Sequence, residues 1–230
     1  MKINTLIFSA VLLFIPALSP AADAVIKIDK LPHTITKSGD YELTGNLTVN
    51  GTDGITVKAS NVVINLNGYS ITQSSAGSGN GINDVNSSKI VVENGSISGF
   101  QVGVNFGSNG NVSSCQALNL RVFAVNPVSI DGNDCLVGNC FLIGTGASAD
   151  GAGVFMGGAN DQVQNCHISN LSDGVLSANL NGNGILNNYV ASCTYGLGLG
   201  SNDYYQGNIV TNCTTPFSGG NAVGTENGGN

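Results

Sequence analysis

Short apolar segments recur along most of this chain, and apolar and polar residues alternate within them. In Asn61–Ile71, for example, aliphatic residues occupy every second position over the first half. Alternation with a period of two is typical of a half-buried β-strand, and Gly and Asn bound the segments. The chain contains 33 Gly, a poor residue for a helix interior. We therefore predict an all-β chain of short strands joined by tight bends.

The segments form a repeat. One motif begins at Val92, Val112, Val137, Val163 and Leu186, and from Val112 onward the intervals are 25, 26 and 23 residues. A second motif of the Gly-Val type follows each first one, starting at Gly103, Ala124, Gly153, Gly174 and Gly196. A period of about 25 residues without helical segments is typical of a solenoid of parallel strands. The Val/Ile strands lack the Leu-x-x-Leu-x-Leu pattern of a leucine-rich repeat, the competing solenoid.

The pattern thus predicts a single-stranded right-handed parallel β-helix of about seven coils. Residues 25–45 are expected to form an N-terminal cap and first strand, residues 46–218 the β-helix, and residues 219–230 a C-terminal tail. Residues 1–24 have a basic start, an apolar run and the small-x-small sequence Ala22-Asp23-Ala24. The run is shorter than the roughly 20 residues that span a membrane. We therefore expect a signal peptide and an exported protein, secreted or periplasmic, without a membrane span after cleavage.

Three stretches carry a family resemblance. Asn61–Ile71 looks like an early coil, Val91–Phe100 followed by Gly103-Val104 looks like a second coil, and residues 32–49 look like the start of the helix. Together they resemble the right-handed parallel β-helix proteins of the pectate-lyase-like superfamily, over about residues 32–220. That superfamily includes polysaccharide lyases, glycoside hydrolases, uronate epimerases, adhesins and non-catalytic repeat proteins. The resemblance therefore implies a fold and a polysaccharide or cell-surface glycan as partner, without selecting a reaction.

Charge is scarce in this chain. Only 9% of residues are charged, with seven Lys or Arg, and the formal net charge is −7. So few basic residues exclude a general nucleic-acid binder, which must neutralise phosphates. The negative charge also argues against a polyanionic glycan unless a cation bridges the two.

Polar and sulfur residues in the repeat have structural interpretations. Asn94, Asn139, Asn165 and Asn188 are expected to stack as a ladder at one bend, and Asp134, Asp161 and Asp203 to share one turn column. Cys115, Cys140 and Cys166 are expected at one position of successive coils, and Cys193 and Cys213 at another. A buried stack of free thiols is favoured over disulfides, because parallel side chains suit the disulfide dihedral poorly.

The outward positions of the Gly-Val strands form a neutral stripe that is a candidate glycan-binding surface. The expected substrate-binding residues on it are Asn105, Asn126, Phe155 and Leu176.

A few residues remain that would carry chemistry. Asp150, at the end of the longest insertion, is expected near Asp173 and Tyr195, with Arg121 close to the same strand start. His167 is expected to point outward beside Phe141 and Val190. In a lyase or epimerase, Arg121 or Lys89 would neutralise developing charge, and His167 or Tyr195 would act as base or acid. In a hydrolase, Asp150 and Asp173 would supply the carboxylate pair.

None of these residues belongs to a motif of the resembled enzymes. Neither the Asn-Thr-Asp and Gly-His-Gly segments of the hydrolases nor the calcium-binding carboxylates of the lyases are present. No motif supports a calcium site, so no metal or cofactor is predicted. Two function classes stay open: a carbohydrate-binding or cell-surface structural protein without catalysis, and a small polysaccharide-active enzyme.

Overall fold

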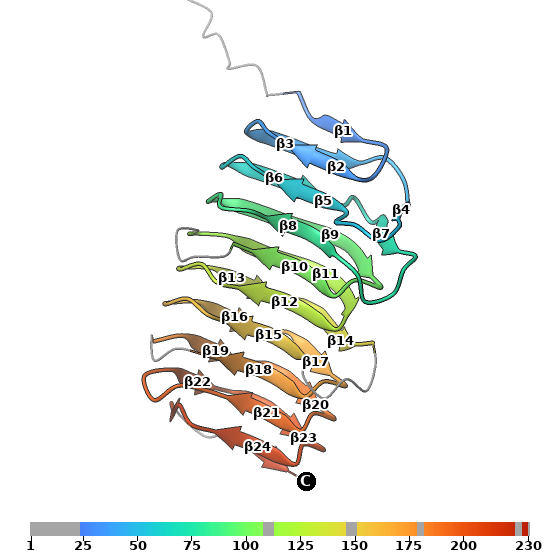
Figure 1. Ribbon diagram of the computed structural model, residues 1–230. Coiled ribbons are helices and arrows are strands. Elements are labelled where there is room, and N and C mark those ends of the chain that lie inside the picture. Colours follow the sequence, from blue (N-terminus) through green and yellow to red (C-terminus); the bar gives the residue numbers. More distant parts are fainter. Residues whose placement is uncertain (1–23, 108–112, 146–150, 179–181, 224–226, 230) are drawn as a thin grey trace, which may run out of the picture.

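The computed structural model describes residues 24–107, 113–145, 151–178, 182–223 and 227–229. All regular structure in these residues is β-strand, and every strand pairing is parallel. Successive turns of the chain stack along one axis (Figure 1), which confirms the predicted parallel β-solenoid, with about eight turns. None of the described residues forms a helix long and apolar enough to cross a membrane.

Each turn contributes strands to three stacked columns. The first column contains β1 (Ile26–Ile28), β3 (Gly39–Leu43), β6 (Val62–Asn65), β9 (Ile90–Ser98), β11 (Gln116–Ala124), β13 (Leu136–Gly138), β16 (Gln162–Gln164), β19 (Gly184–Leu186), β22 (Tyr204–Gln206) and β25 (Asn221–Ala222). The second contains β4 (Leu47–Val49), β7 (Ser70–Gln73), β14 (Phe141–Gly144), β17 (His167–Ser169), β20 (Tyr189–Ala191), β23 (Ile209–Thr211) and β26 (Asn227–Gly229). The long strands β9 and β11 run through both columns and join them into one 17-stranded sheet.

The third column is a separate nine-stranded sheet. Its members are β2 (His33–Ile35), β5 (Ile55–Val57), β8 (Asn80–Asp84), β10 (Val102–Phe106), β12 (Asn126–Ile130), β15 (Ala152–Met156), β18 (Asp173–Ser177), β21 (Tyr195–Gly198) and β24 (Thr215–Ser218). The predicted signal peptide lies almost wholly in residues outside the described ranges. Residues 219–230, expected as a tail, include β25 and β26, which pair with the preceding turn.

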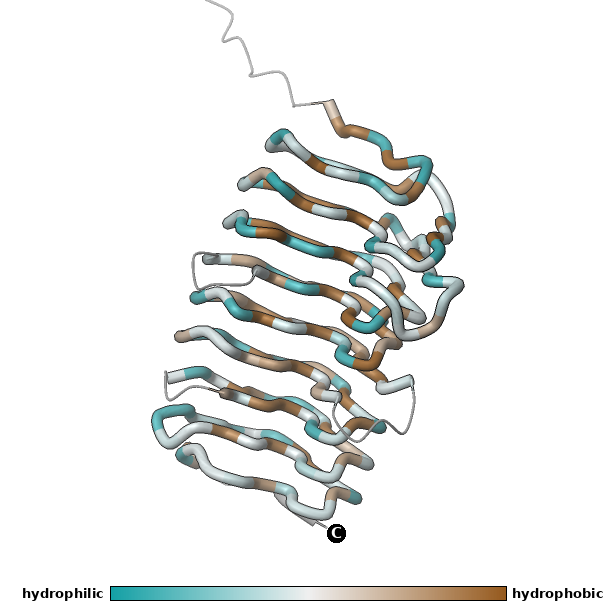
Figure 2. Tube along the Cα trace, in the orientation of Figure 1, coloured by the Kyte–Doolittle hydropathy of each residue, from teal (hydrophilic) through white to brown (hydrophobic). Residues whose placement is uncertain are grey.

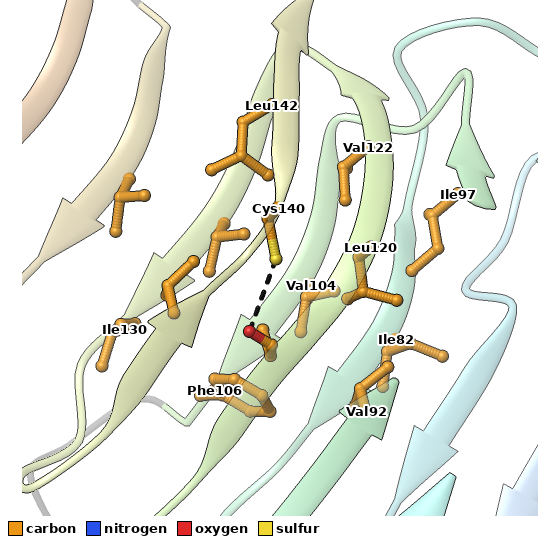
Figure 3. Packing of buried hydrophobic residues seen from close by; sticks show 14 of the residues in the cluster. Ile82, Val92, Ile97, Val104, Phe106, Leu120, Val122, Ile130, Cys140 and Leu142 are labelled. Carbon is orange, nitrogen blue, oxygen red and sulfur yellow. Dashed lines mark hydrogen bonds between the residues drawn. The ribbon is translucent and has the colours of Figure 1, made fainter. Parts of the chain in front are cut away.

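The apolar side of every strand faces the inside of the coil. Apolar positions alternate with polar ones along each turn (Figure 2), as the period of two predicts. Side chains such as Ile82, Ile97 and Val104 are completely buried and pack against those of neighbouring turns (Figure 3). The core is therefore one continuous stack that runs the length of the solenoid.

In one inward-facing column of the nine-stranded sheet, the glycine positions have no room for a side chain. Most of its strands carry two consecutive buried residues, a small one and then a larger apolar one, such as Gly174-Val175. A Cβ added at Gly174 would collide with Val190 Cγ1 and with the Gly196 carbonyl oxygen. The Gly-Val motif of the sequence thus marks the place where each strand passes tightly over the core. The register places Pro127 in the same column as Gly103.

The cysteines are free and buried, but one of the predicted register relations was wrong. Cys115 stacks on Cys135, since the Cys115 amide donates to Cys135 Sγ at 3.4 Å. It does not share the column of Cys140 and Cys166, which pair with each other. The relation between Cys193 and Cys213 is confirmed, because the amide after Cys213 donates to the Cys193 carbonyl.

The predicted polar columns also need correction. At the bend the left-handed residue is Asn187, whereas Asn188 points inward and donates to Asn208 Oδ1. Asp161 and Asp203 share a buried column, linked through Asn183. Asp134 lies one residue earlier in its bend and contacts Asn160 instead. The strand register sets Gln162 opposite Leu136 and Ile185 opposite Val163, so residues that the repeat motif aligns by type are offset by one position.

Candidate functional site

Two outward columns run side by side along the nine-stranded sheet. The first column, in register order, is Asn83, Asn105, Ser129, Phe155, Leu176, Gly198 and Ser218. The second is Asn80, Val102, Asn126, Ala152, Asp173, Tyr195 and Thr215. Most of these side chains are half-buried, so the surface between the columns is a shallow depression rather than a deep cleft.

Two cavities lie between these columns. The first, of about 320 Å³, is lined by Val102, Asn126, Ser129, Ala152, Phe155 and Leu176. The second, of about 310 Å³, is lined by Asp173, Leu176, Ser177, Tyr195, Gly198, Leu199 and Ser218. Because Leu176 borders both, they form one depression across strands β10 to β24, which we call the trough. It combines apolar surface with a few hydrogen-bonding groups, which is the usual composition of a small-molecule site.

The predicted stripe is partly correct in its register. Phe155 and Leu176 are adjacent members of the first column and both line the trough. Asn126 lines it too, but belongs to the second column, and its Oδ1 accepts the Ala152 amide at 3.0 Å. Asn105 lies in the first column outside the two cavities, and its amide donates to Asn83 Oδ1 at 3.0 Å.

Asp173 and Tyr195 are direct neighbours on adjacent turns, as the sequence predicted. Partial burial raises the pKa of Asp173, although a hydrogen bond with the Ser172 side chain lowers it in part. Tyr195 is 43% exposed, so its ring borders the second cavity from the solvent side. The pair places a protonatable carboxyl group beside a phenol. The predicted partner Asp150 lies outside the described residues.

A small residue keeps the second cavity open. The strand conformation at Gly198 is ordinary, and a Cβ there would meet Leu176 Cδ1 at 3.4 Å and Asp173 Oδ1 at 3.8 Å. Both are normal van der Waals distances. The position therefore accepts a side chain, and that side chain would occupy the cavity floor.

Arg121 and His167 lie in the 17-stranded sheet and therefore in a different column from Asp173. The Arg121 guanidinium carbon lies 5.7 Å from the centre of the Phe141 ring. The Phe141 and His167 rings stack at 5.5 Å, and His167 stacks on Tyr189 at 4.9 Å. The prediction that Val190 lies beside His167 on the surface was wrong. Val190 is buried, and Tyr189 occupies the outward position. We call this surface row the aromatic ladder.

Sequence reasoning missed several trough residues. Val102, Ser129 and Ala152 line the first cavity but were not predicted. The sequence contains a signal that could have identified them: Pro127-Val128 takes the place of the Gly-Val motif in β12. Alignment of this pair with Gly103-Val104 puts Ser129 beside Phe155 and Asn126 beside Val102.

Metal-ligating residues do not gather in the part of the chain that the structure describes. Within it, no group of three or more His, Cys, Asp or Glu side chains is arranged to hold a metal ion.

Comparison with known proteins gives a likeness of fold. No protein-family model and no curated protein matches the chain. Among solved structures, the crystal structure of pectate lyase Pel9A is similar, with a TM-score of 0.56 and 15% sequence identity. The match covers 81% of this chain and 55% of the lyase, so the chain spans about half the length of that protein. The chain therefore has a pectate-lyase-like parallel β-helix fold.

Proposed function

We propose that this chain is an exported carbohydrate-binding β-helix protein whose glycan ligand lies along the trough of the nine-stranded sheet. The observation that carries the proposal is the trough itself. Two cavities of similar volume follow one another along the solenoid axis, which suits a linear ligand built from repeating units. The pectate-lyase-like fold supports a polysaccharide ligand by analogy.

Phe155 is the best-placed aromatic group for such a ligand. The apolar C–H face of a sugar ring packs on an aromatic face that is not already covered. In the aromatic ladder, ring faces are covered by each other and by Arg121. Phe155 is half-buried beside Leu176 and stacks on no other aromatic ring among the described residues. Asn126 and Ser129 next to it supply polar groups for sugar hydroxyls.

Titration calorimetry with a panel of oligosaccharides tests this proposal. Phe155→Ala should weaken binding at least about ten-fold, as expected for a central aromatic contact. Gly198→Val should weaken it as well, because the new side chain fills the second cavity. Phe141→Ala removes a more exposed ring that lies outside the trough and should leave binding unchanged. If Phe141→Ala weakens binding and Phe155→Ala does not, the ligand lies elsewhere.

One observation favours an enzymatic alternative. Asp173 combines a raised pKa with a neighbouring Tyr195, an arrangement suited to general acid catalysis. A lyase, epimerase or hydrolase reaction would use it at the second cavity. Incubation with polysaccharides, followed by assays for new reducing ends and for the ultraviolet absorbance of unsaturated uronates, decides between the two. Product formation that is lost in Asp173→Asn would favour the enzyme.

Export is part of the proposal. We expect cleavage near Ala22 or Ala24, and mass spectrometry of the mature N-terminus tests this directly. Intact residues 1–24 on the protein in its final location would contradict it.

A further inference from the structure

On the basis of the glycan-binding trough proposed above, we infer that the trough selects uncharged glycans over uronate-containing ones, and that Asp173 sets this selectivity. The similar solved structure is that of a pectate lyase, and pectate is an acidic polysaccharide. The charges of this chain point the other way.

All of the net charge of the chain comes from its C-terminal half. Residues 122–230 contain seven Asp or Glu and no Lys or Arg, whereas residues 1–121 contain seven of each. The second cavity of the trough is built wholly from residues after 170. A ligand in this cavity therefore meets a section of the solenoid that has no basic side chain to offer.

Above its pKa, Asp173 places a negative charge inside the trough. It lines the second cavity, and its Oδ1 lies near the Gly198 position that forms the cavity floor. The other lining side chains are apolar, hydroxyl or phenol groups, so none of them compensates a carboxylate. A uronate bound here would bring a second carboxylate into a partly desolvated site, and like charges at close range repel strongly.

The candidate cation nearest in the sequence, Arg121, is engaged on another face. The Arg121 guanidinium lies over the Phe141 ring in the 17-stranded sheet. His167 is stacked between the Phe141 and Tyr189 rings in the same row. Within the described residues, no cluster of ligating side chains offers a site for a bridging cation.

The same carboxylate suits a neutral sugar. Sugar hydroxyls are donors, and a carboxylate accepts two or more hydrogen bonds from them more strongly than a neutral oxygen does. Asp173 therefore strengthens the binding of a hydroxyl group at the position where it weakens the binding of a carboxylate. A single residue thus favours the neutral sugar and disfavours the uronate.

A matched ligand pair tests the inference. Hexagalacturonate and its fully methyl-esterified form differ in charge but not in backbone, and a neutral hexasaccharide panel accompanies them. Calorimetry at low ionic strength should show that the ester and at least one neutral oligomer bind about ten-fold or more tightly than the free acid. Added salt should narrow the difference between the ester and the acid, because it screens the repulsion.

Two variants with the same change in net charge identify the residue responsible. Asp173→Asn should improve binding of hexagalacturonate about ten-fold, while Asp131→Asn, which removes a half-buried carboxylate outside the trough, should not. Equal or tighter binding of the free acid by the unmodified protein would overturn the inference and leave the glycan-binding proposal standing. Equal effects of the two variants would overturn the role of Asp173. Absence of binding by every oligomer would overturn both proposals together.

Discussion

At the scale of single residues, space rather than backbone conformation explains the Gly-Val motif. Gly174 has an ordinary strand conformation, but the volume that a Cβ needs is taken by Val190 and by the Gly196 carbonyl group. At the neighbouring Gly198, an added Cβ would meet other atoms only at ordinary van der Waals distances. Two glycines in adjacent strands of one sheet therefore have opposite tolerance to substitution.

Gly174→Ala should destabilise the protein by about 1–3 kcal/mol, as expected for overpacking of a well-filled core. Gly198→Ala is the matched control and should change the free energy of unfolding by less than about 0.5 kcal/mol. Urea denaturation followed by circular dichroism measures both. A tolerated Gly174→Ala would show that the turns can separate to admit a methyl group.

Asp161 is a second residue with an unusual environment. It is completely buried, its Oδ1 accepts the Cys135 amide at 2.9 Å, and its Oδ2 has no hydrogen-bond partner. Burial, with smaller contributions from Asp134 and Asp203, raises the pKa of Asp161 to about 7. The unfolded value is near 3.8, so the folded state binds the proton more tightly between these two values.

The stability of the protein should therefore fall as pH rises. The contribution of Asp161 is fully present below pH about 4 and is lost as pH passes through about 7, a change of up to about 4 kcal/mol. Asp161→Asn should flatten this dependence and stabilise the protein at pH 8, because Asn183 shows that an amide fits the same column. Urea midpoints at pH 5 and pH 8 for both proteins provide the measurement. Parallel profiles would contradict the assignment.

The limits of prediction from sequence are visible at these residues. Alternation identified the strands because burial on one face is a local property. Register was harder: Asn126 and Cys115 were misplaced because Pro127 hides the Gly-Val motif and because bends differ in length. Arg121 was expected near Asp173 at the same strand start, but it lies in the 17-stranded sheet, in the same row as His167.

At the scale of strands, the aromatic ladder shows how outward positions stabilise a solenoid. Phe141 is 50% exposed, so it gains little from burial. Its contacts are with the equivalent residues of adjacent turns, Arg121 and His167. Each stacked pair contributes about 0.5–1.5 kcal/mol. The ladder therefore ties β11, β14, β17 and β20 together from the outside.

His167→Ala should destabilise the protein by about 1–2 kcal/mol, since it removes two stacked contacts. His167→Phe should restore most of the loss, while His167→Thr, which favours strands equally, should not. Double-mutant cycles with Phe141 and Tyr189 isolate the pair energies. Additive effects would show that the rings do not interact energetically.

The stacked cysteine pairs are a second feature at the scale of strands. All six cysteines are buried and unbridged, and burial raises the pKa of Cys193 to about 12. Buried structural thiols are shielded from reagents and react slowly. The folded protein should therefore resist alkylation, and denaturation without a reductant should allow six modifications, counted by mass spectrometry. Fewer than six would reveal a disulfide between stacked turns.

At the scale of the whole molecule, contacts are limited to adjacent turns. The central strands are covered on both edges, whereas β24, the last strand of the nine-stranded sheet, is covered on one. Near this end the inward residues Tyr205 and Phe217 stack on each other at 5.2 Å but remain only partly buried, unlike the equivalent residues of earlier turns. Stability in such an array varies along its axis.

Hydrogen exchange should therefore be graded along the solenoid. Amides of β24 should exchange on the order of 100-fold faster than those of β12 and β15. Exchange measured by mass spectrometry on peptides from each turn provides the comparison. Uniform protection from β10 to β24 would show that the last turn is covered by a partner or that the molecule opens only as a unit.

The repeated register of the nine-stranded sheet also makes length an adjustable property. β15 and β18 are equivalent, with Ala152 opposite Asp173 and Val154 opposite Val175. Excision of residues 152–172 would join Gly151 to Asp173 and set Val175 over Val128, a shortening of the trough by one strand spacing of about 4.8 Å. In a globular domain with a single hydrophobic core, such a deletion leaves a cavity in that core. In this solenoid, whole turns can be removed or duplicated as units. The length of ligand that the trough accommodates therefore changes in steps of one turn.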